Sequence, residues 1–172
     1  VGVNQRHIAR DETISDMAVK AGEKMFVDYP EVNKEEVDFV ILCTQSPDYF
    51  LPSTACIVQR RLGLRTACGA FDFNLGCSGY EYGLGIAKNI LLLTSEAYNK
   101  HIHSRDKGNR TIFGDGATAT LVSTDGFAEI GDFILGTDGS GAEELIVKTG
   151  GMAYPEKAHD LEYDENGNPH SS

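Results

Sequence analysis

The sequence has no long apolar run and little positive charge, and both shortages exclude classes of function. No stretch approaches the roughly 20 apolar residues that a membrane-spanning helix needs, so we expect no span. Lys and Arg total 15 against 26 Asp and Glu among 172 residues, which gives a formal net charge of −11. Such a charge repels nucleic acid and anionic membrane surfaces. We therefore expect neither nucleic acid nor a membrane as a partner.

Cysteines are few, and none of them forms the C-x-x-C pair that is typical of zinc or redox sites. The four are Cys43, Cys56, Cys68 and Cys77. We expect all of them to be reduced and no metal to be bound. Cys43, Cys56 and Cys68 are each expected to be a small buried apolar side chain.

Two further signals are missing. Residues 1–6 do not resemble a signal peptide, so we expect a cytoplasmic protein. Gly83-Leu84-Gly85 follows a predicted helix rather than a strand, so it does not fit a nicotinamide or flavin fingerprint. We expect no cofactor.

Strands and helices alternate along most of the chain, which predicts an α/β fold with a largely parallel sheet. A helix is expected after Thr13 and Ser15, with Met17, Ala21 and Met25 on its buried face. Buried strands are expected at residues 37–43, 67–73 and 89–95, helices at 53–62 and about 77–87, and antiparallel strands within 111–124 and 127–137. Ser53 or Thr54 is expected to cap the second helix. Residues 154–172 are acidic and turn-forming, so they predict a solvated excursion with little core.

The segment Asp72-Phe73-Asn74-Leu75-Gly76-Cys77-Ser78-Gly79-Tyr80 places a cysteine where a buried strand turns sharply into a helix. Small residues on both sides of Cys77 permit the tight turn. A helix N-terminus presents free N–H groups and positive dipole density, which favour a thiolate and an oxyanion beside it. This pattern is typical of an activated nucleophile.

Other segments make the pattern more specific. Phe50-Leu51-Pro52-Ser53-Thr54-Ala55-Cys56 precedes the cysteine, and Ser95-Glu96 and Phe113-Gly114-Asp115-Gly116-Ala117 follow it. With residues 2–8, 13–18 and 138–141, these segments make residues 1–153 resemble β-ketoacyl-ACP synthase III of the thiolase superfamily. The resemblance implies a thiolase-like layered fold, a mixed sheet with covering helices. Residues 1–153 would be the N-terminal domain of a two-half enzyme, and 154–172 would lead toward the C-terminal half.

The resemblance also implies an activity. An acyltransferase of this kind takes an acyl group from acyl-CoA onto the cysteine that matches Cys77. The acyl-enzyme then condenses with malonyl-ACP, with loss of carbon dioxide, to give a β-ketoacyl-ACP for fatty-acid biosynthesis and lipid metabolism. Lys107 matches a basic residue that contacts the nucleotide part of CoA, and Phe50 lies in a loop that approaches the acyl pocket and the partner of a homodimer. Phe113 to Ala117 are expected to form a structural turn, with no acid or base role for Asp115.

The sequence departs from the family in three ways. The family's C-terminal His and Asn, which decarboxylation requires, have no match, and the five histidines are expected in loops or on the surface. The family's N-terminal segment that stacks on CoA also has no match. About nine residues of the family's pattern are missing between Ala87 and Lys88, where a helix meets a strand without room for an ordinary connection, so we expect residues to be absent there.

Two alternatives follow from these departures. A chain without the second half would be a non-catalytic thiolase-fold module for acyl-carrier binding or dimerisation. A thioesterase or cysteine hydrolase would need a base near Cys77, and the sequence offers none.

Overall fold

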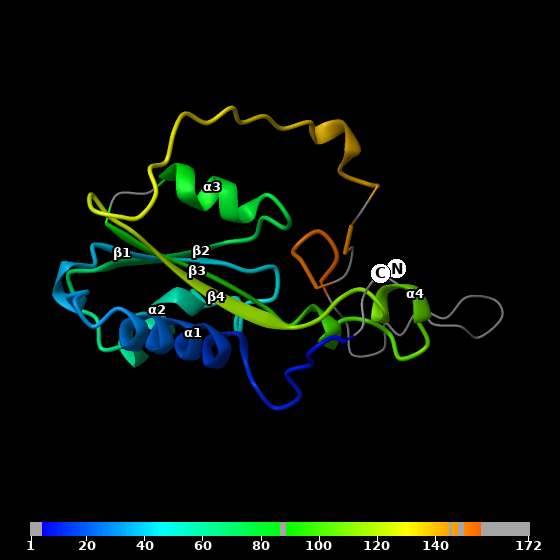
Figure 1. The fold of residues 1–172 in the computed structure, drawn as a ribbon. Helices are drawn as coiled ribbons and strands as arrows, with labels where there is room; N and C mark the ends of the chain where they lie inside the picture. The colour runs from blue at the N-terminus through cyan, green and yellow to red at the C-terminus, as the bar shows by residue number, and fades with distance from the viewer. Residues whose placement is uncertain (1–4, 87–88, 145, 148–149, 156–172) are drawn as a thin grey trace, which may run out of the picture.

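A mixed four-stranded sheet forms the centre of the protein (Figure 1). The computed structural model describes residues 5–86, 89–144, 146–147 and 150–155. The strands are β1 (Phe39–Cys43), β2 (Gly69–Phe73), β3 (Ile90–Glu96) and β4 (Gly116–Val122), in the order β2-β1-β3-β4. β1 is parallel to β2 and β3, whereas β4 runs antiparallel to β3. The predicted parallel centre with an added antiparallel strand is confirmed.

Helices cover both faces of this sheet. α1 (Ile14–Asp28) and α2 (Thr54–Arg61) lie on one face and α3 (Gly79–Ile86) on the other (Figure 1). The remaining helical elements are short: η1 (Lys34–Glu36), η2 (Tyr98–Lys100), α4 (Lys107–Arg110) and η3 (Gly139–Gly141). The predicted fold class, a layered mixed sheet with covering helices, is confirmed.

α1 begins where the sequence predicts, at a capping box. The Thr13 hydroxyl accepts a hydrogen bond from the Asp16 N–H, and the Asp16 carboxylate accepts one from the Thr13 N–H at 2.8 Å. Met17 and Met25 are buried on the sheet side of the helix, and Ala21 is half-buried. The four-residue spacing therefore identified the buried face correctly.

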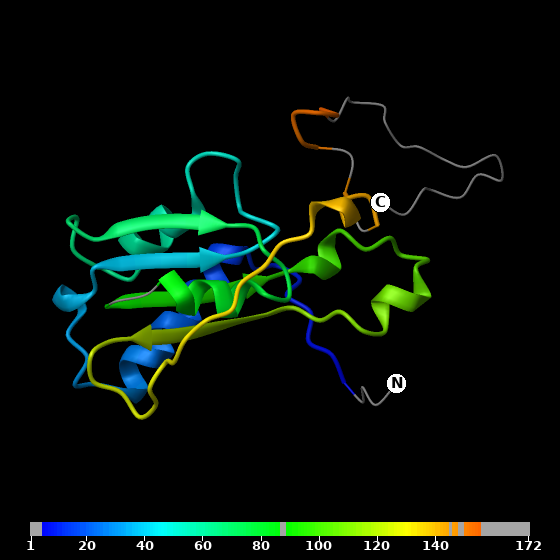
Figure 2. The same ribbon diagram turned by 90° about the horizontal axis from the view of Figure 1, so that it is seen from above.

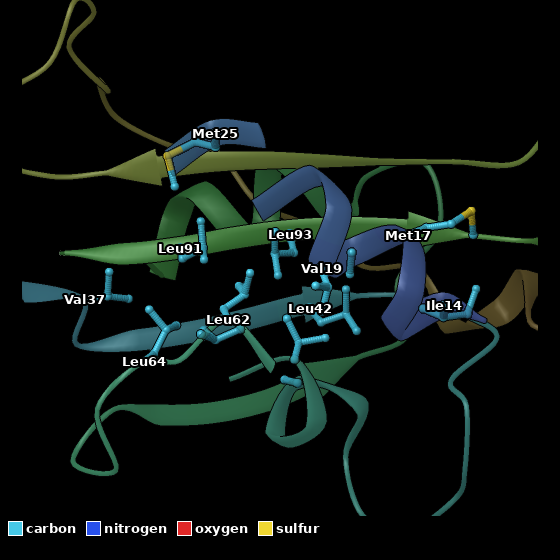
Figure 3. Close-up of a cluster of buried hydrophobic side chains, with 14 of the residues drawn as sticks. Ile14, Met17, Val19, Met25, Val37, Leu42, Leu62, Leu64, Leu91 and Leu93 are labelled. Atoms are coloured by element: carbon cyan, nitrogen blue, oxygen red, sulfur yellow. The ribbon is translucent and has the colours of Figure 1, made fainter. Parts of the chain in front are cut away.

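β1 and β3 carry the core because both of their faces are covered. Leu42, Leu91 and Leu93 point into a cluster shared with α1 and α2 (Figure 3). Ile41 and Leu92, on alternate positions, pack on the opposite face below α3. Each such side chain contributes about 1.5–3 kcal/mol when it is fully buried. The continuously apolar strands of the sequence reflect this two-sided burial.

Two glycines allow α3 to lie close to the sheet. A Cβ atom on Gly79 would lie 2.2 Å from the Cys43 Sγ, and a Cβ on Gly83 would lie 2.6 Å from a methyl carbon of Leu92. These glycines are four residues apart and therefore occupy one face of the helix. A larger residue at either position would require the Cys43 or Leu92 side chain, or α3 itself, to shift.

Two sequence predictions near α2 are wrong. Neither Ser53 nor Thr54 caps the helix with its side chain, because the Asp72 carboxylate accepts the N–H groups of Thr54 and Ala55 instead. Cys56 is exposed rather than buried, since Ala55 and Val58 form the face of α2 that meets the sheet. Cys43 and Cys68 are buried, as expected.

The predicted strand at residues 127–137 is also wrong. β4 is an edge strand, and the segment after it crosses above α3 instead of pairing with it (Figures 1 and 2). The Tyr82 hydroxyl donates to the Gly136 carbonyl at 2.9 Å, and the Phe133 ring lies close to Gly85. Contacts with α3 therefore hold this segment away from the sheet edge.

Some predictions fall outside the described residues. The join between Ala87 and Lys88 and most of the acidic stretch 154–172 lie there, and only Tyr154 and Pro155 of that stretch are described, both exposed. None of the helices in the described part of the chain is long and apolar enough to span a membrane.

Candidate active site

The three predicted site residues follow three parallel strands. Phe50 lies in the loop after β1, Cys77 in the turn after β2, and Lys107 in the segment after β3. Because parallel strands end at the same edge of a sheet, these connections all leave from one edge (Figure 2). In open α/β sheets this edge is where ligands bind. The topology thus brings the three residues to the edge that suits a site.

Cys77 lies in a tight turn and is exposed. The Gly79 N–H donates to the Gly76 carbonyl at 2.9 Å, and the Tyr82 N–H donates to the Ser78 carbonyl at 3.1 Å, so the chain passes from turn to helix directly after the cysteine. α3 begins at Gly79, two residues later than predicted. The prediction that Cys77 lies between a strand and a helix is therefore confirmed.

A second cysteine lies beneath this turn. Cys43 is the last residue of β1 and is buried, and its thiol donates to the Leu75 carbonyl with an Sγ–O distance of 3.1 Å. Burial, assisted by the negative charge of Glu96, raises the pKa of Cys43 to about 11. At neutral pH this thiol is therefore protonated and able to donate. Sequence reasoning treated Cys43 only as an apolar side chain.

Two carboxylates at the strand ends hold the neighbouring loops. Asp72 of β2 accepts the Thr54 and Ala55 N–H groups at 2.5 and 2.6 Å. Glu96 of β3 accepts the Gln45 N–H at 2.8 Å and the hydroxyl of Ser46. Charge-assisted bonds of this kind are stronger than neutral ones. They fix the loop that carries Phe50 at both of its ends.

Asp115 has a similar structural role. Its carboxylate accepts the N–H groups of Ala9 at 2.9 Å and Asn99 at 3.2 Å, and its own N–H donates to the His7 carbonyl at 2.9 Å. A Cβ on Gly114 would approach that carbonyl oxygen at 3.2 Å. The Phe113 to Ala117 segment therefore joins the N-terminal segment to the connection after β3, which fits the predicted structural turn.

Phe50 and Lys107 both face solvent. Phe50 is 87% exposed, and Lys107 is an exposed residue at the start of α4, whose N-cap is Asp106. Among the hydrogen bonds of the described residues, none joins the Lys107 side chain to Cys77. Of the histidines in these residues, His7 and His101 are exposed and His103 is half-buried.

A shallow cleft of about 380 Å³ lies beside α3 on the face of β3 and β4. It is lined by Tyr80, Thr94, Thr118 and Thr120, whose hydroxyls pair across it. Tyr80 lies three residues after Cys77, so the cleft begins close to the turn. Within the described ranges, no group of three or more His, Cys, Asp or Glu side chains could hold a metal ion.

Comparison with known proteins identifies the resemblance independently. Residues 71–139 match the family model of 3-oxoacyl-[acyl-carrier-protein (ACP)] synthase III, a range that includes Cys77 and Lys107. The β-ketoacyl-[acyl-carrier-protein] synthase III of Clostridium perfringens (strain ATCC 13124) is 40% identical over 157 residues, which cover 86% of this chain and 48% of the relative. A crystal structure of a 3-oxoacyl-(acyl-carrier-protein) synthase III is 47% identical and has a TM-score of 0.86, with 99% of this chain and 54% of that chain covered.

The predicted resemblance to β-ketoacyl-ACP synthase III is confirmed. The corresponding synthase from Burkholderia xenovorans LB400 agrees, with 36% identity, a TM-score of 0.78, and coverage of 92% of this chain and 48% of that one. The chain spans about half the length of the β-ketoacyl-ACP synthase III relatives that it matches.

The match to the Clostridium synthase is longer than the part of this chain that it covers. It extends over 157 residues but takes in 86% of the 172 residues here, which is about 148. The relative therefore has about nine residues within the matched stretch that have no counterpart in this chain. The comparison gives no position for these residues, so the expected absence between Ala87 and Lys88 stays a prediction.

Proposed function

We propose that the protein is the N-terminal half of a condensing enzyme in which Cys77 accepts an acyl group from acyl-CoA. The observation that carries the proposal is the exposed Cys77 in the turn between β2 and α3, inside the segment matched by the synthase III family. A thiolate attacks a thioester with little change in leaving-group energy, so the acyl group moves to Cys77 as the CoA thiolate departs. The Cys77 N–H would help to hold the oxyanion.

The later steps belong to the same proposal. The acyl-enzyme condenses with malonyl-ACP: carbon dioxide leaves, the carbanion attacks the acyl carbonyl, and the Cys77 thiolate is released. Decarboxylation would need groups from a second half, because no hydrogen bond among the described residues joins a histidine to Cys77. Lys107 would attract the phosphates of CoA, although a lysine offers a point charge and no planar fork. A cytoplasmic place in fatty-acid synthesis remains a prediction.

Mass spectrometry of the intact protein tests the first step. After incubation with acetyl-CoA and longer acyl-CoAs, we expect one acyl adduct, lost in Cys77→Ala and retained in Cys56→Ala. Cys56 is a matched control because it is the other exposed cysteine. Relative to wild type, Lys107→Ala should form the adduct more slowly from acyl-CoA. With a short acyl thioester that has no nucleotide, the two proteins should react at similar rates.

The opposite result would favour the second candidate. A wild-type protein without any adduct, or an adduct that survives in Cys77→Ala, would remove the catalytic assignment. The chain would then act as a non-catalytic module for acyl-carrier binding or dimerisation. The coverage of only about half of the relatives is the observation that keeps this candidate in view.

A further inference from the structure

We infer that Cys43 is a positioning residue whose buried thiol holds the turn that presents Cys77. The inference rests on the proposed function, because it concerns the reactivity of that same cysteine. Its evidence is a pair of contacts that the Cys43 sulphur makes on the two sides of the turn.

The first contact lies on the strand side. The Cys43 thiol donates to the carbonyl of Leu75, two residues before Cys77. Leu75 is exposed, and this bond ties its carbonyl to the end of β1, 32 positions earlier in the chain. The bond therefore fixes the position at which the chain leaves β2.

The second contact lies on the helix side. Gly79, two residues after Cys77, approaches the Cys43 sulphur so closely that a Cβ there would lie 2.2 Å from it. The sulphur thus fills the space below the first residue of α3. Because both contacts converge on one atom, the spacing between Leu75 and Gly79 is determined by Cys43.

Thr44 and Gln45, which follow Cys43, also contact the segment around the turn. The Thr44 N–H donates to the Phe73 carbonyl at 3.0 Å, and a Cβ on Gly76 would meet the Gln45 side chain at 3.4 Å. The floor of the turn is therefore the end of β1, and Cys43 is its innermost member. Its protonated state at neutral pH keeps the donor in place.

The inference predicts an effect on reactivity that exceeds any effect on stability. Without the sulphur, the turn and the start of α3 can shift, which weakens the alignment of the helix N-terminus with the Cys77 thiolate. Small misplacements of a reacting group reduce rates substantially. We expect Cys43→Ala to slow acyl transfer about tenfold in kcat with little change in KM for acyl-CoA.

The test measures alkylation of Cys77 by iodoacetamide across pH, together with acyl transfer, in the folded variants. Exposed Cys56 provides an internal reference in every sample. We expect alkylation of Cys77, measured relative to Cys56, to slow in Cys43→Ala and to return toward the wild-type rate in Cys43→Ser, whose hydroxyl retains a donor. Cys68→Ala, which removes another buried thiol at the opposite end of β2, should leave the profile unchanged.

Equal Cys77 profiles in wild type and Cys43→Ala would overturn the inference, as would equal shifts in Cys43→Ala and Cys68→Ala. If Cys43→Ala does not fold, Cys43→Ser decides: a tenfold loss of Cys77 reactivity despite the retained donor would also overturn it. A wild-type protein that accepts no acyl group would contradict the proposed function alone, because the alkylation profiles still report whether Cys43 positions Cys77.

Discussion

At the scale of single residues, the turn that carries Cys77 depends on how closely Gly79 approaches Cys43. Gly79→Ala places a Cβ 2.2 Å from the Cys43 sulphur, a distance that nonbonded atoms cannot keep. We expect the substitution to lower the free energy of unfolding by about 1–3 kcal/mol, which is typical of overpacking. In a Cys43→Ala background the sulphur is gone, so the same substitution should cost less.

Urea unfolding of wild type, Cys43→Ala, Gly79→Ala and the double variant measures the interaction energy between the two residues. Residues in direct contact show interaction energies of about 0.5–3 kcal/mol. Additive effects of Cys43→Ala and Gly79→Ala, within about 0.3 kcal/mol, would contradict the close contact.

Residue-level prediction from the sequence succeeded where the signal is local. The position of Cys77 between a strand and a helix was predicted correctly because glycines flank it and a strand precedes it, whereas its role stays a prediction. The Cys43 contact and the Asp72 cap were missed because they join residues 32 and 17 or 18 positions apart. Nothing in the pattern around Asp72 shows that its carboxylate meets the start of α2.

At the scale of elements, the capping box of α1 links stability to pH. The Thr13 backbone N–H, followed by the Thr13 hydroxyl and Arg61, lowers the pKa of Asp16 from 3.8 to about 2. A carboxyl whose pKa is lower in the folded state stabilises the fold above its unfolded pKa, and this contribution is lost as the pH falls from about 4 toward 2.

We therefore expect Asp16→Ala to lower the free energy of unfolding by about 1 kcal/mol at pH 7, a value that allows for solvent screening of this partly exposed side chain. The difference from wild type should be smaller at pH 3. Urea unfolding at both values checks this, with Glu23→Ala on the exposed side of α1 as the control. A pH-independent difference for Asp16→Ala would contradict the assignment.

The connection between α3 and β3 carries another element-scale prediction. We expect the native polypeptide to have about nine residues between Ala87 and Lys88, because a helix meets a strand there without room for an ordinary connection. Digestion at glutamate should release the peptide between Glu81 and Glu96. Its mass should exceed that of Tyr82 to Glu96 in the present sequence, whereas a peptide of that same mass would contradict the expectation.

Element prediction succeeded for strands with a distinctive environment and failed for one without a partner. β1 and the first four residues of β3 are apolar because helices cover both faces of these strands, and this is visible in the sequence. Residues 127–137 have the composition of a strand, but the segment contacts α3 through Tyr82 and Phe133 instead of pairing with the sheet edge at β4. The composition of the segment does not show whether it pairs with β4 or packs on α3.

At the scale of the whole molecule, an apolar loop tip projects from the edge where the site lies. Tyr49, Phe50 and Leu51 are consecutive and all exposed, Phe50 by 87%. Asp72 and Glu96 hold the two ends of this loop, so its apolar tip is presented on a fixed base. An exposed apolar cluster on a rigid base is typical of an interaction surface. We expect the partner to be a second copy of the chain.

We therefore predict a homodimer that the loop tip stabilises. Phe50→Asp should weaken dimerisation at least tenfold, because it places a charge where an apolar contact is desolvated. Sedimentation equilibrium of wild type and variant measures this, and Phe127→Asp is the matched control, since Phe127 is a fully exposed phenylalanine outside the loop. Because Phe50 is largely exposed within one chain, its substitution should leave thermal unfolding of the monomer unchanged, which separates an interface effect from a folding defect. A monomeric wild type, or equal weakening by both substitutions, would exclude the loop tip as the dimer contact.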